Sequence, residues 1–293
     1  NQLLLLSYSG NVYYYDDATQ SLVLATQFNL DNQLSWIKAL QLHDGQYVFA
    51  TKSHLQIHLA DGTFLGDFPW TDKNGLIKNI FQDKQQRVWL LTSNGLHQLF
   101  PDSLTIKAIK DIPYFVEQMA EDLNGDLWIS SRSGLIWWEQ QSNQLTIYKD
   151  ELKQQANIDY IHDIAVDTDG LLWVGGSGDG LAVVASKQAF LIEKYSSKSP
   201  YELANEMVWS IYTEGDKIWF GTDGRLSVVE GKGSSITVIP PGLKISDSIY
   251  TLASLDENHI VLGTTSGLYV VNKITNAGTD FASWSGGKES LDG

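Results

Sequence analysis

Large polar and aromatic residues recur at one position of a repeated sequence pattern. Each copy of the pattern has an acidic residue, or an equivalent residue, that opens a tight turn, and we call this residue the turn acid. The variable position lies five residues before the turn acid and holds Lys78, Glu117, His162, Trp209 and Tyr250, with Trp36 in a weaker copy. Three residues before the acid, the same copies hold only apolar residues, namely Ile80, Met119, Ile164, Ile211 and Leu252. This contrast indicates that core packing fixes the second position and leaves the first available for recognition.

Loops next to this position add further groups that bind polar organic molecules. The aligned loop supplies Arg132, Asp179 and Arg225, and nearby entry loops supply Tyr114, Phe115, Asp159 and Tyr160. Aromatic rings stack on the apolar faces of a ligand, while charged groups bind its hydroxyls or carboxylates. We therefore predict a binding site for a sugar-like or polar organic ligand. The alternative is that these are ordinary solvated loop residues, each paired locally.

The residue spacing gives no positive support for catalysis or for metal binding. Asp122 opens the spacing of a calcium loop, but Leu127 replaces the required glycine and Ser133 replaces the bidentate glutamate. A hairpin turn explains that segment better. His54 and His58 would lie on one face of a strand about 13 Å apart, too far to share one ion. We expect no catalytic residue, no metal ligand and no cofactor in this chain.

Seven similar segments follow one another along the chain. The four clearest combine an acid, a tight turn, an apolar run with tryptophan second or third, a small polar loop, a glycine and a second apolar run. The anchor residues of the seven segments are Leu4, Tyr47, Trp89, Trp128, Trp173, Trp219 and Ile260. Neighbouring anchors are 39 to 46 residues apart. That spacing is typical of four-stranded propeller blades.

The predicted fold is an all-β, seven-bladed β-propeller with four antiparallel strands per blade, spanning residues 1–272. We expect the anchor tryptophans to pack between blades, and the loop glycines to need a positive φ or a close backbone approach. The first copy begins at its second strand, so its innermost strand must come from elsewhere. Residues 273–293 are expected to supply the outer strand of the last blade, at residues 281–284, and a flexible or ring-closing tail. The alternative is an all-β sandwich with accidental similarity.

Composition narrows the classes of partner. The 293 residues carry 20 basic and 35 acidic side chains, a net charge of −15, which disfavours nucleic acid and anionic membrane surfaces as partners. No apolar run reaches the roughly 18 residues that span a bilayer. With no cysteine, the chain has neither disulfide nor thiolate chemistry. Because it begins at Asn1 without a signal peptide, we expect a processed or excised piece of a longer protein.

The repeat resembles that of a bacterial sensor family. The pattern acid-x-x-Gly-x-Leu-Trp-Ile/Val-Gly-x-x-x-Gly-Leu is clearest in EDLNGDLWISSRSGLIWW and VDTDGLLWVGGSGDGLAVV, and it resembles the two-component regulator propeller repeat. That family occurs in the periplasmic sensor region of hybrid histidine kinases and diguanylate cyclases. The resemblance covers most of residues 1–272 and implies the extracytoplasmic part of an inner-membrane protein, with membrane contact only through segments outside this chain. Similar blades also occur in stand-alone lyases, so the fold alone does not define the function.

Three functional hypotheses follow. The first is a non-catalytic sensor domain of a bacterial membrane signal-transduction receptor, which binds an extracellular small molecule or oligosaccharide on its loop face. Adjoining propeller or receptor domains and a second receptor chain are further candidate partners. The second is a lyase or hydrolase in which His162, Glu117 and Lys78 converge as an acid/base site at the channel mouth. The third is a protein-interaction scaffold, which an exposed apolar loop face would favour.

Overall fold

A computed structural model shows that the chain is built from antiparallel sheets in two compact units. One unit runs up to Val116 and the other begins at Glu117. The structure describes residues 4–6, 11–16, 19, 21–27, 38–51, 54–61, 63–70, 72–112, 115–132, 134–148, 151–185, 190–196, 198, 203, 205–231, 234, 237–238 and 247–284.

The first unit contains three sheets. The N-terminal sheet has three strands in the order β1 (Leu4–Leu6), β2 (Asn11–Asp16) and β3 (Ser21–Gln27). The second sheet has the order β4 (Lys38–Gln41), β5 (Tyr47–Ala50), β6 (His54–His58) and β7 (Phe64–Pro69). After a short 3-10 helix, η1 (Asp72–Asn74), the third sheet follows with β8 (Ile77–Gln82), β9 (Val88–Thr92), β10 (Gly95–Phe100) and β11 (Thr105–Asp111).

The second unit contains four sheets, each with four strands in sequence order. The first has β12 (Val116–Glu121), β13 (Leu127–Ser131), β14 (Gly134–Glu139) and β15 (Gln144–Tyr148). Helix α1 (Glu151–Ala156) leads to β16 (Ile161–Val166), β17 (Leu172–Gly176), β18 (Leu181–Ala185) and β19 (Phe190–Tyr195). The last two sheets are β20 (Val208–Glu214), β21 (Lys217–Thr222), β22 (Arg225–Glu230) and β23 (Thr237–Val238), then β24 (Ile249–Ser254), β25 (His259–Thr264), β26 (Gly267–Asn272) and β27 (Gly278–Asp280).

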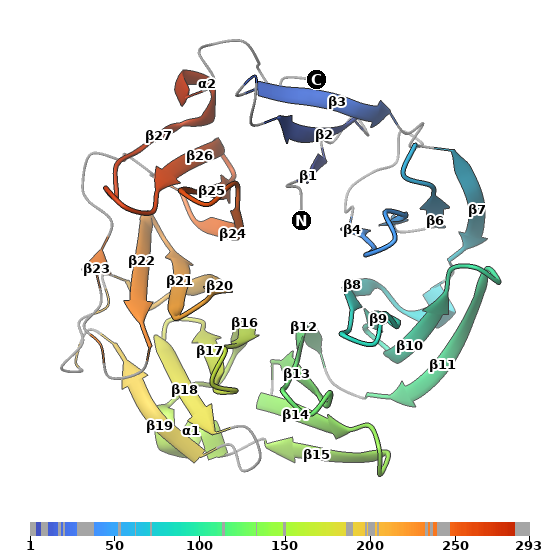
Figure 1. Cartoon of the computed structure of the whole chain (residues 1–293). Helices are drawn as coiled ribbons and strands as arrows, with labels where there is room; N and C mark the ends of the chain where they lie inside the picture. Colours follow the sequence, from blue (N-terminus) through green and yellow to red (C-terminus); the bar gives the residue numbers. More distant parts are fainter. Residues whose placement is uncertain are drawn as a thin grey trace. The chain divides into compact units, whose positions relative to one another are not determined.

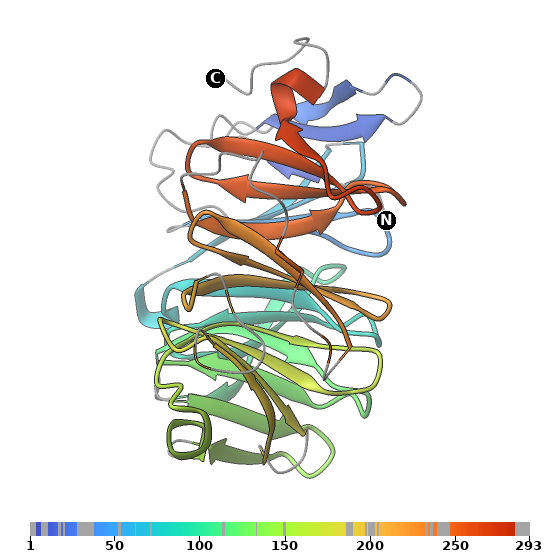
Figure 2. The ribbon, with the colours of Figure 1, turned by 90° about the vertical axis from the view of Figure 1, so that its left-hand side faces the viewer.

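The sheets of the second unit follow one another along an arc, with the first strand of each blade on the inner side (Figure 1). Strand β16 packs beside β20, and β20 packs beside β24. A side view shows these sheets lying face to face, from the green sheet of β12–β15 to the red sheet of β24–β27 (Figure 2). First strands from consecutive blades are therefore neighbours, although they lie roughly 40 residues apart in sequence.

The prediction of seven four-stranded blades is wrong. The fold is an all-β propeller whose described residues form six four-stranded blades, and the N-terminal sheet has only three strands. The reason lies in the sequence of the first copy, which begins at its second strand. Leu4, the predicted anchor, is the first residue of β1, so no strand precedes the anchor strand within the described part of this sheet.

The end of the last blade also differs from the prediction. Its outer strand is β27, and the predicted strand at Phe281–Trp284 is instead the short helix α2. Strand β27 runs Gly278–Asp280, and the Asp280 side chain accepts a hydrogen bond from the backbone N–H of Ser283 at 2.7 Å. An aspartate that accepts from a first-turn N–H is a helix N-cap, so the chain turns into a helix at this point.

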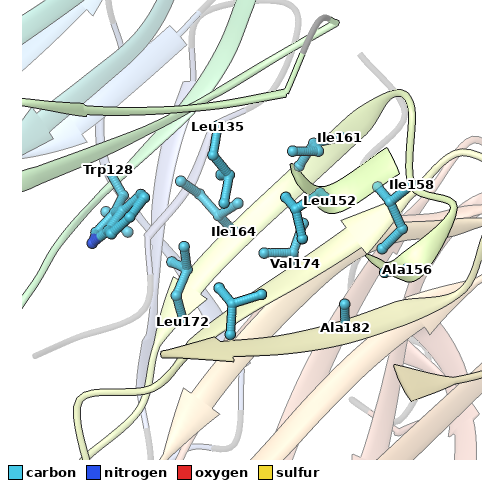
Figure 3. Packing of buried hydrophobic residues seen from close by; sticks show 12 residues of the cluster. Trp128, Leu135, Leu152, Ala156, Ile158, Ile161, Ile164, Leu172, Val174 and Ala182 are labelled. Carbon is cyan, nitrogen blue, oxygen red and sulfur yellow. The ribbon is translucent and has the colours of Figure 1, made fainter. Parts of the chain in front are cut away.

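Apolar side chains from consecutive blades meet between the sheets. Trp128 on β13 and Leu135 on β14 pack against Ile164 on β16 and Leu172 on β17, and helix α1 covers the same cluster with Leu152 (Figure 3). Trp89, Trp128, Trp173 and Trp219 are all at most 2% exposed. Trp128, Trp173 and Trp219 each pack with residues of the next blade. Burying a large aromatic side chain stabilises a fold by about 2–3 kcal/mol, so these three residues hold neighbouring blades together.

The turn acid supports the anchor tryptophan as well as the turn. Asp167 Oδ1 accepts the backbone N–H groups of Asp169 and Leu171, while its Oδ2 accepts the indole N–H of Trp173 at 2.7 Å. Asp83 accepts the indole N–H of Trp89 at 2.8 Å in the same way. One buried carboxylate thus satisfies both the hairpin turn and the buried indole.

The loop glycine is required by the backbone, as predicted. Gly180 has a φ of 87°, and a Cβ there would lie 2.3 Å from the carbonyl oxygen of Tyr195. Gly95 has a φ of 146°, and its Cβ would lie 2.3 Å from the carbonyl oxygen of Lys110. Only glycine fits a position that combines this φ with so close an approach.

Candidate functional site

The variable position of the repeat coincides with a β-bulge on the first strand of a blade. Lys78, His162, Trp209 and Tyr250 are the second residues of β8, β16, β20 and β24. At each of them the register with the next strand shifts, so the first strand carries one extra residue without a partner in the pairing. Glu117 is the second residue of β12. A bulge redirects the side chain of the extra residue and often lies beside a functional site.

Four rings from three consecutive blades form a continuous line, which we call the aromatic row: Tyr160, His162, Trp209 and Tyr250. The ring centroids of Tyr160 and His162 are 4.5 Å apart, and those of His162 and Trp209 are 4.2 Å apart. Tyr250 stands edge-on to Trp209 with centroids 5.1 Å apart. The neighbouring first strands bring these rings together, and the bulges place His162, Trp209 and Tyr250 at equivalent points of their blades, while Tyr160 directly precedes β16.

Charged groups define one end of the aromatic row. The Tyr160 hydroxyl donates a hydrogen bond to Glu117 Oε1 at 3.2 Å, and Arg132 Nε lies 3.7 Å from the same oxygen. The Arg132 guanidinium carbon is 5.1 Å from the centroid of the Tyr160 ring, a cation–π distance. The Arg132 side chain is nevertheless 56% exposed. This end therefore combines a ring, a carboxylate and a guanidinium group that still faces solvent.

A second carboxylate, Asp223, lies farther along the row, beside Trp209. Asp223 Oδ1 accepts the indole N–H of Trp209 at 2.6 Å and the hydroxyl of Ser248 at 2.5 Å. Asp223 follows β21 and forms an isolated backbone bridge with Ser248, just before β24. The loop of one blade is thus tied to the entry of the next, and the Trp209 ring is fixed in orientation.

His162, the histidine of the row, is a partly buried ring that is neutral at pH 7. Burial lowers the pKa of His162 first, and the positive charge of Arg132 lowers it further, while Glu117 and Asp223 oppose the shift. Its Nε2 is buried and has no hydrogen-bond partner among the described residues. Burial also raises the pKa of Tyr160, with Glu117 acting in the same direction. At neutral pH both rings are therefore uncharged.

The remaining predicted site residues have different surroundings. Asp159 pairs with Lys153 at 2.7 Å, and Asp179 accepts a hydrogen bond from Asn157 at 3.2 Å, so both are engaged locally. Arg225 is exposed at the start of β22. In the first unit, Phe115 is 68% exposed and Lys78 holds the bulged position of β8. Trp36 and Tyr114 lie outside the described residues.

Sequence reasoning did not select three residues that position the row. Asp223 was passed over because the repeat alignment selected Arg225 two residues later, and Ser248 precedes β24 in a segment without a repeat counterpart. Asp163 is the third: its Oδ2 accepts the backbone N–H of Ile211 on the neighbouring first strand at 2.7 Å. The signal in the sequence was that Asp163 directly follows the variable position of the repeat. From there a short polar side chain reaches the next blade.

Comparisons with known proteins support the fold. No protein-family model matches the sequence, and a search of the curated proteins gives no match. Among solved structures, the extracellular domain of a putative hybrid two-component system from B. thetaiotaomicron superposes with a TM-score of 0.68 at 16% identity. The alignment covers 94% of this chain but 41% of that one, so the chain spans less than half the length of this neighbour.

Two further neighbours have other activities or partners. A catalytically inactive virginiamycin B lyase from Staphylococcus aureus, solved with quinupristin, has a TM-score of 0.69 at 13% identity, covering 92% of this chain and 97% of that one. YCF48 bound to D1 peptide has a TM-score of 0.71 at 13% identity, covering 92% and 89%. At these identities the likeness establishes the fold alone, which this chain shares with an extracellular two-component-system domain, a lyase and a protein solved with a bound peptide. Within the described residues, no helix has the length and apolarity to cross a membrane.

Proposed function

We propose that this chain is a ligand-sensing propeller from the extracytoplasmic, periplasmic part of a bacterial membrane signal-transduction receptor. Its ligand, a glycan-like or polar organic molecule, binds along the aromatic row. The observation that carries this proposal is the placement of His162, Trp209 and Tyr250 at bulged positions on three consecutive first strands. The likeness to an extracellular two-component-system domain and the resemblance of the repeat support the receptor context.

The chemistry of the row suits such a ligand. Trp209 and Tyr250 offer ring faces or edges for apolar surfaces, and Tyr250 is 48% exposed. Glu117 with Arg132 at one end of the row and Asp223 beside Trp209 offer charged hydrogen-bonding groups for polar substituents. Signalling then requires that the ligand prefer one arrangement of the receptor over another, because a ligand with equal affinity for both shifts nothing.

A thermal-shift screen of glycans and polar organic molecules tests the proposal, followed by titration of each stabilising compound against variants. We expect Trp209→Ala and Tyr250→Ala to weaken binding by about tenfold or more, because each removes a stacking surface. Phe100→Ala, which removes an exposed ring on β10 of the first unit, is the control and should leave affinity unchanged. Hits that bind equally well to all three variants would place recognition elsewhere and refute the proposed site.

A second candidate function is a lyase that uses His162 as its base. The observation that favours it is the neutral imidazole with an unpartnered Nε2, set between Tyr160 and Trp209 and near Glu117. Incubation with quinupristin, the ligand of the lyase neighbour, provides a direct probe. The sensor proposal predicts no turnover. Turnover that disappears in His162→Ala would replace the sensor proposal with the enzymatic one.

A further inference from the structure

The Asp223 carboxylate, beside Trp209 in the aromatic row, is held in place by hydrogen bonds to only one of its two oxygens. Both hydrogen bonds to Asp223, from Trp209 and from Ser248, end on Oδ1. Oδ2 accepts no hydrogen bond from any described residue, and no lysine or arginine in the described part of the chain forms an ion pair with this carboxylate. Asp223 is also exposed. One oxygen therefore orients the group while the other remains open to an external donor.

The surroundings of Asp223 favour a positive charge. The Trp209 ring donates its N–H to the carboxylate, and the Tyr250 ring stands edge-on to Trp209 at 5.1 Å. Ring faces attract cations through the negative face of their π-systems. His162, the next ring of the row, has a pKa lowered by burial, so it contributes no competing charge at neutral pH. The chain as a whole carries a net charge of −15, which attracts cations over longer range.

We propose that Asp223, Trp209 and Tyr250 form a subsite for the ammonium group of an organic cation. The ammonium group binds Asp223 Oδ2 and contacts the rings of Trp209 and Tyr250, and the rest of the molecule extends along the row toward His162. This inference rests on the proposed function and names its ligand class: an amine-bearing molecule, such as an amino sugar or a quaternary ammonium compound. A neutral sugar would leave the open carboxylate oxygen without a charged partner.

Choline and its neutral isostere 3,3-dimethylbutan-1-ol test the charge requirement, measured by isothermal titration calorimetry. We expect choline to bind at least about tenfold more tightly than the isostere, because only choline carries the positive charge that the carboxylate and the ring faces attract. The affinity for choline should fall as the salt concentration rises. Equal binding of both compounds, or no binding of choline and glucosamine, would overturn the inference.

Asp223→Asn identifies the carboxylate, because asparagine keeps an acceptor for Trp209 and Ser248 while removing the charge. We expect this variant to lose about tenfold or more in choline affinity. Asp169→Asn makes the same change of net charge at an exposed turn and should bind choline as the wild type does. Equal losses in both variants would mean that only the overall charge matters and would contradict the subsite. If Trp209→Ala abolishes binding of a neutral glycan while choline fails to bind, the proposed function stands and the ammonium subsite does not.

Discussion

The sequence predicted His162 as a candidate site residue, but it did not predict the rings that His162 contacts. Its recurrence five residues before the turn acid marked it as a candidate, next to apolar Ile164 two residues later. Regular alternation along a strand puts residues two apart on the same face, so the contrast between these two had no explanation in the sequence. The bulge between Ile161 and Asp163 supplies it, because the extra residue breaks the alternation. Which rings His162 touches depends on other blades and was not predictable.

The lowered pKa of His162 predicts a dependence of stability on pH. The unfolded state, with a histidine pKa of about 6.5, binds the proton more readily than the folded state does. This contribution to stability is present above that pKa and is lost as the pH falls toward the folded-state value. Urea unfolding at pH 7.5 and pH 5.5 should therefore show a smaller loss for His162→Gln than for the wild type. An identical pH dependence in both proteins would contradict the assignment.

Short polar side chains join the first strands of neighbouring blades at the bulges. Asp163 on β16 accepts the N–H of Ile211 on β20, and Ser210 on β20 donates to the carbonyl oxygen of Ile249 on β24 at 2.8 Å. First strands are sheet edges, whose backbone groups would otherwise lack partners. These bonds hold the bulged residues of adjacent blades in a fixed relation, and with them the aromatic row.

Asp163→Ala should expose one specific amide. Without the carboxylate, the N–H of Ile211 loses its partner, so its hydrogen exchange should accelerate while that of buried Val174 in the same unit stays slow. Asp163→Asn retains an acceptor oxygen and serves as the matched control, with exchange close to wild type. An Ile211 amide that exchanges at the wild-type rate in Asp163→Ala would show that the contact does not protect it.

A buried lysine joins the last two blades. Lys273 follows β26, is 8% exposed and donates to Glu214 and to Ser254 Oγ, each at 2.7 Å, and to the carbonyl oxygen of Asp256 at 2.9 Å. Glu214 occupies the turn-acid position of its blade and accepts from a lysine of the next blade, whereas Asp83 and Asp167 accept from their anchor indoles. The indole nitrogen of Trp219, like that of Trp128, has no hydrogen-bond partner among the described residues.

Lys273→Ala should destabilise the fold by about 1–3 kcal/mol, because it removes the positive charge that pairs with Glu214 and the buried donor to Ser254 and to the Asp256 carbonyl oxygen. Lys217→Ala removes a lysine whose partner Glu230 is largely exposed, so its cost should stay below about 1 kcal/mol. Urea denaturation of both variants gives the comparison. Equal effects would mean that the buried pair contributes no more than a surface pair.

At the scale of the whole molecule, the repeat predicted the architecture, but the weak first copy led to a wrong number of four-stranded blades. The four anchor tryptophans, evenly spaced, gave a propeller of four-stranded blades, and the structure has that fold. The number of four-stranded blades was wrong because anchor counting treated Leu4 like the others, although no strand precedes it in the described residues. The position of site residues followed from the repeat, but Asp223 and Ser248 lie in loops that the repeat does not constrain.

The structure places the tryptophans in two classes of surroundings. Trp89, Trp128, Trp173 and Trp219 are buried, whereas Trp209 lies in the aromatic row beside an exposed carboxylate. We propose that ligands contact Trp209 and leave the four anchor tryptophans undisturbed. Fluorine NMR of protein labelled with 5-fluorotryptophan, with resonances assigned by single Trp→Phe variants, measures both classes at once. On adding a stabilising ligand from the screen, the Trp209 resonance should shift and those of the four anchors should not; an unchanged Trp209 resonance would contradict the account.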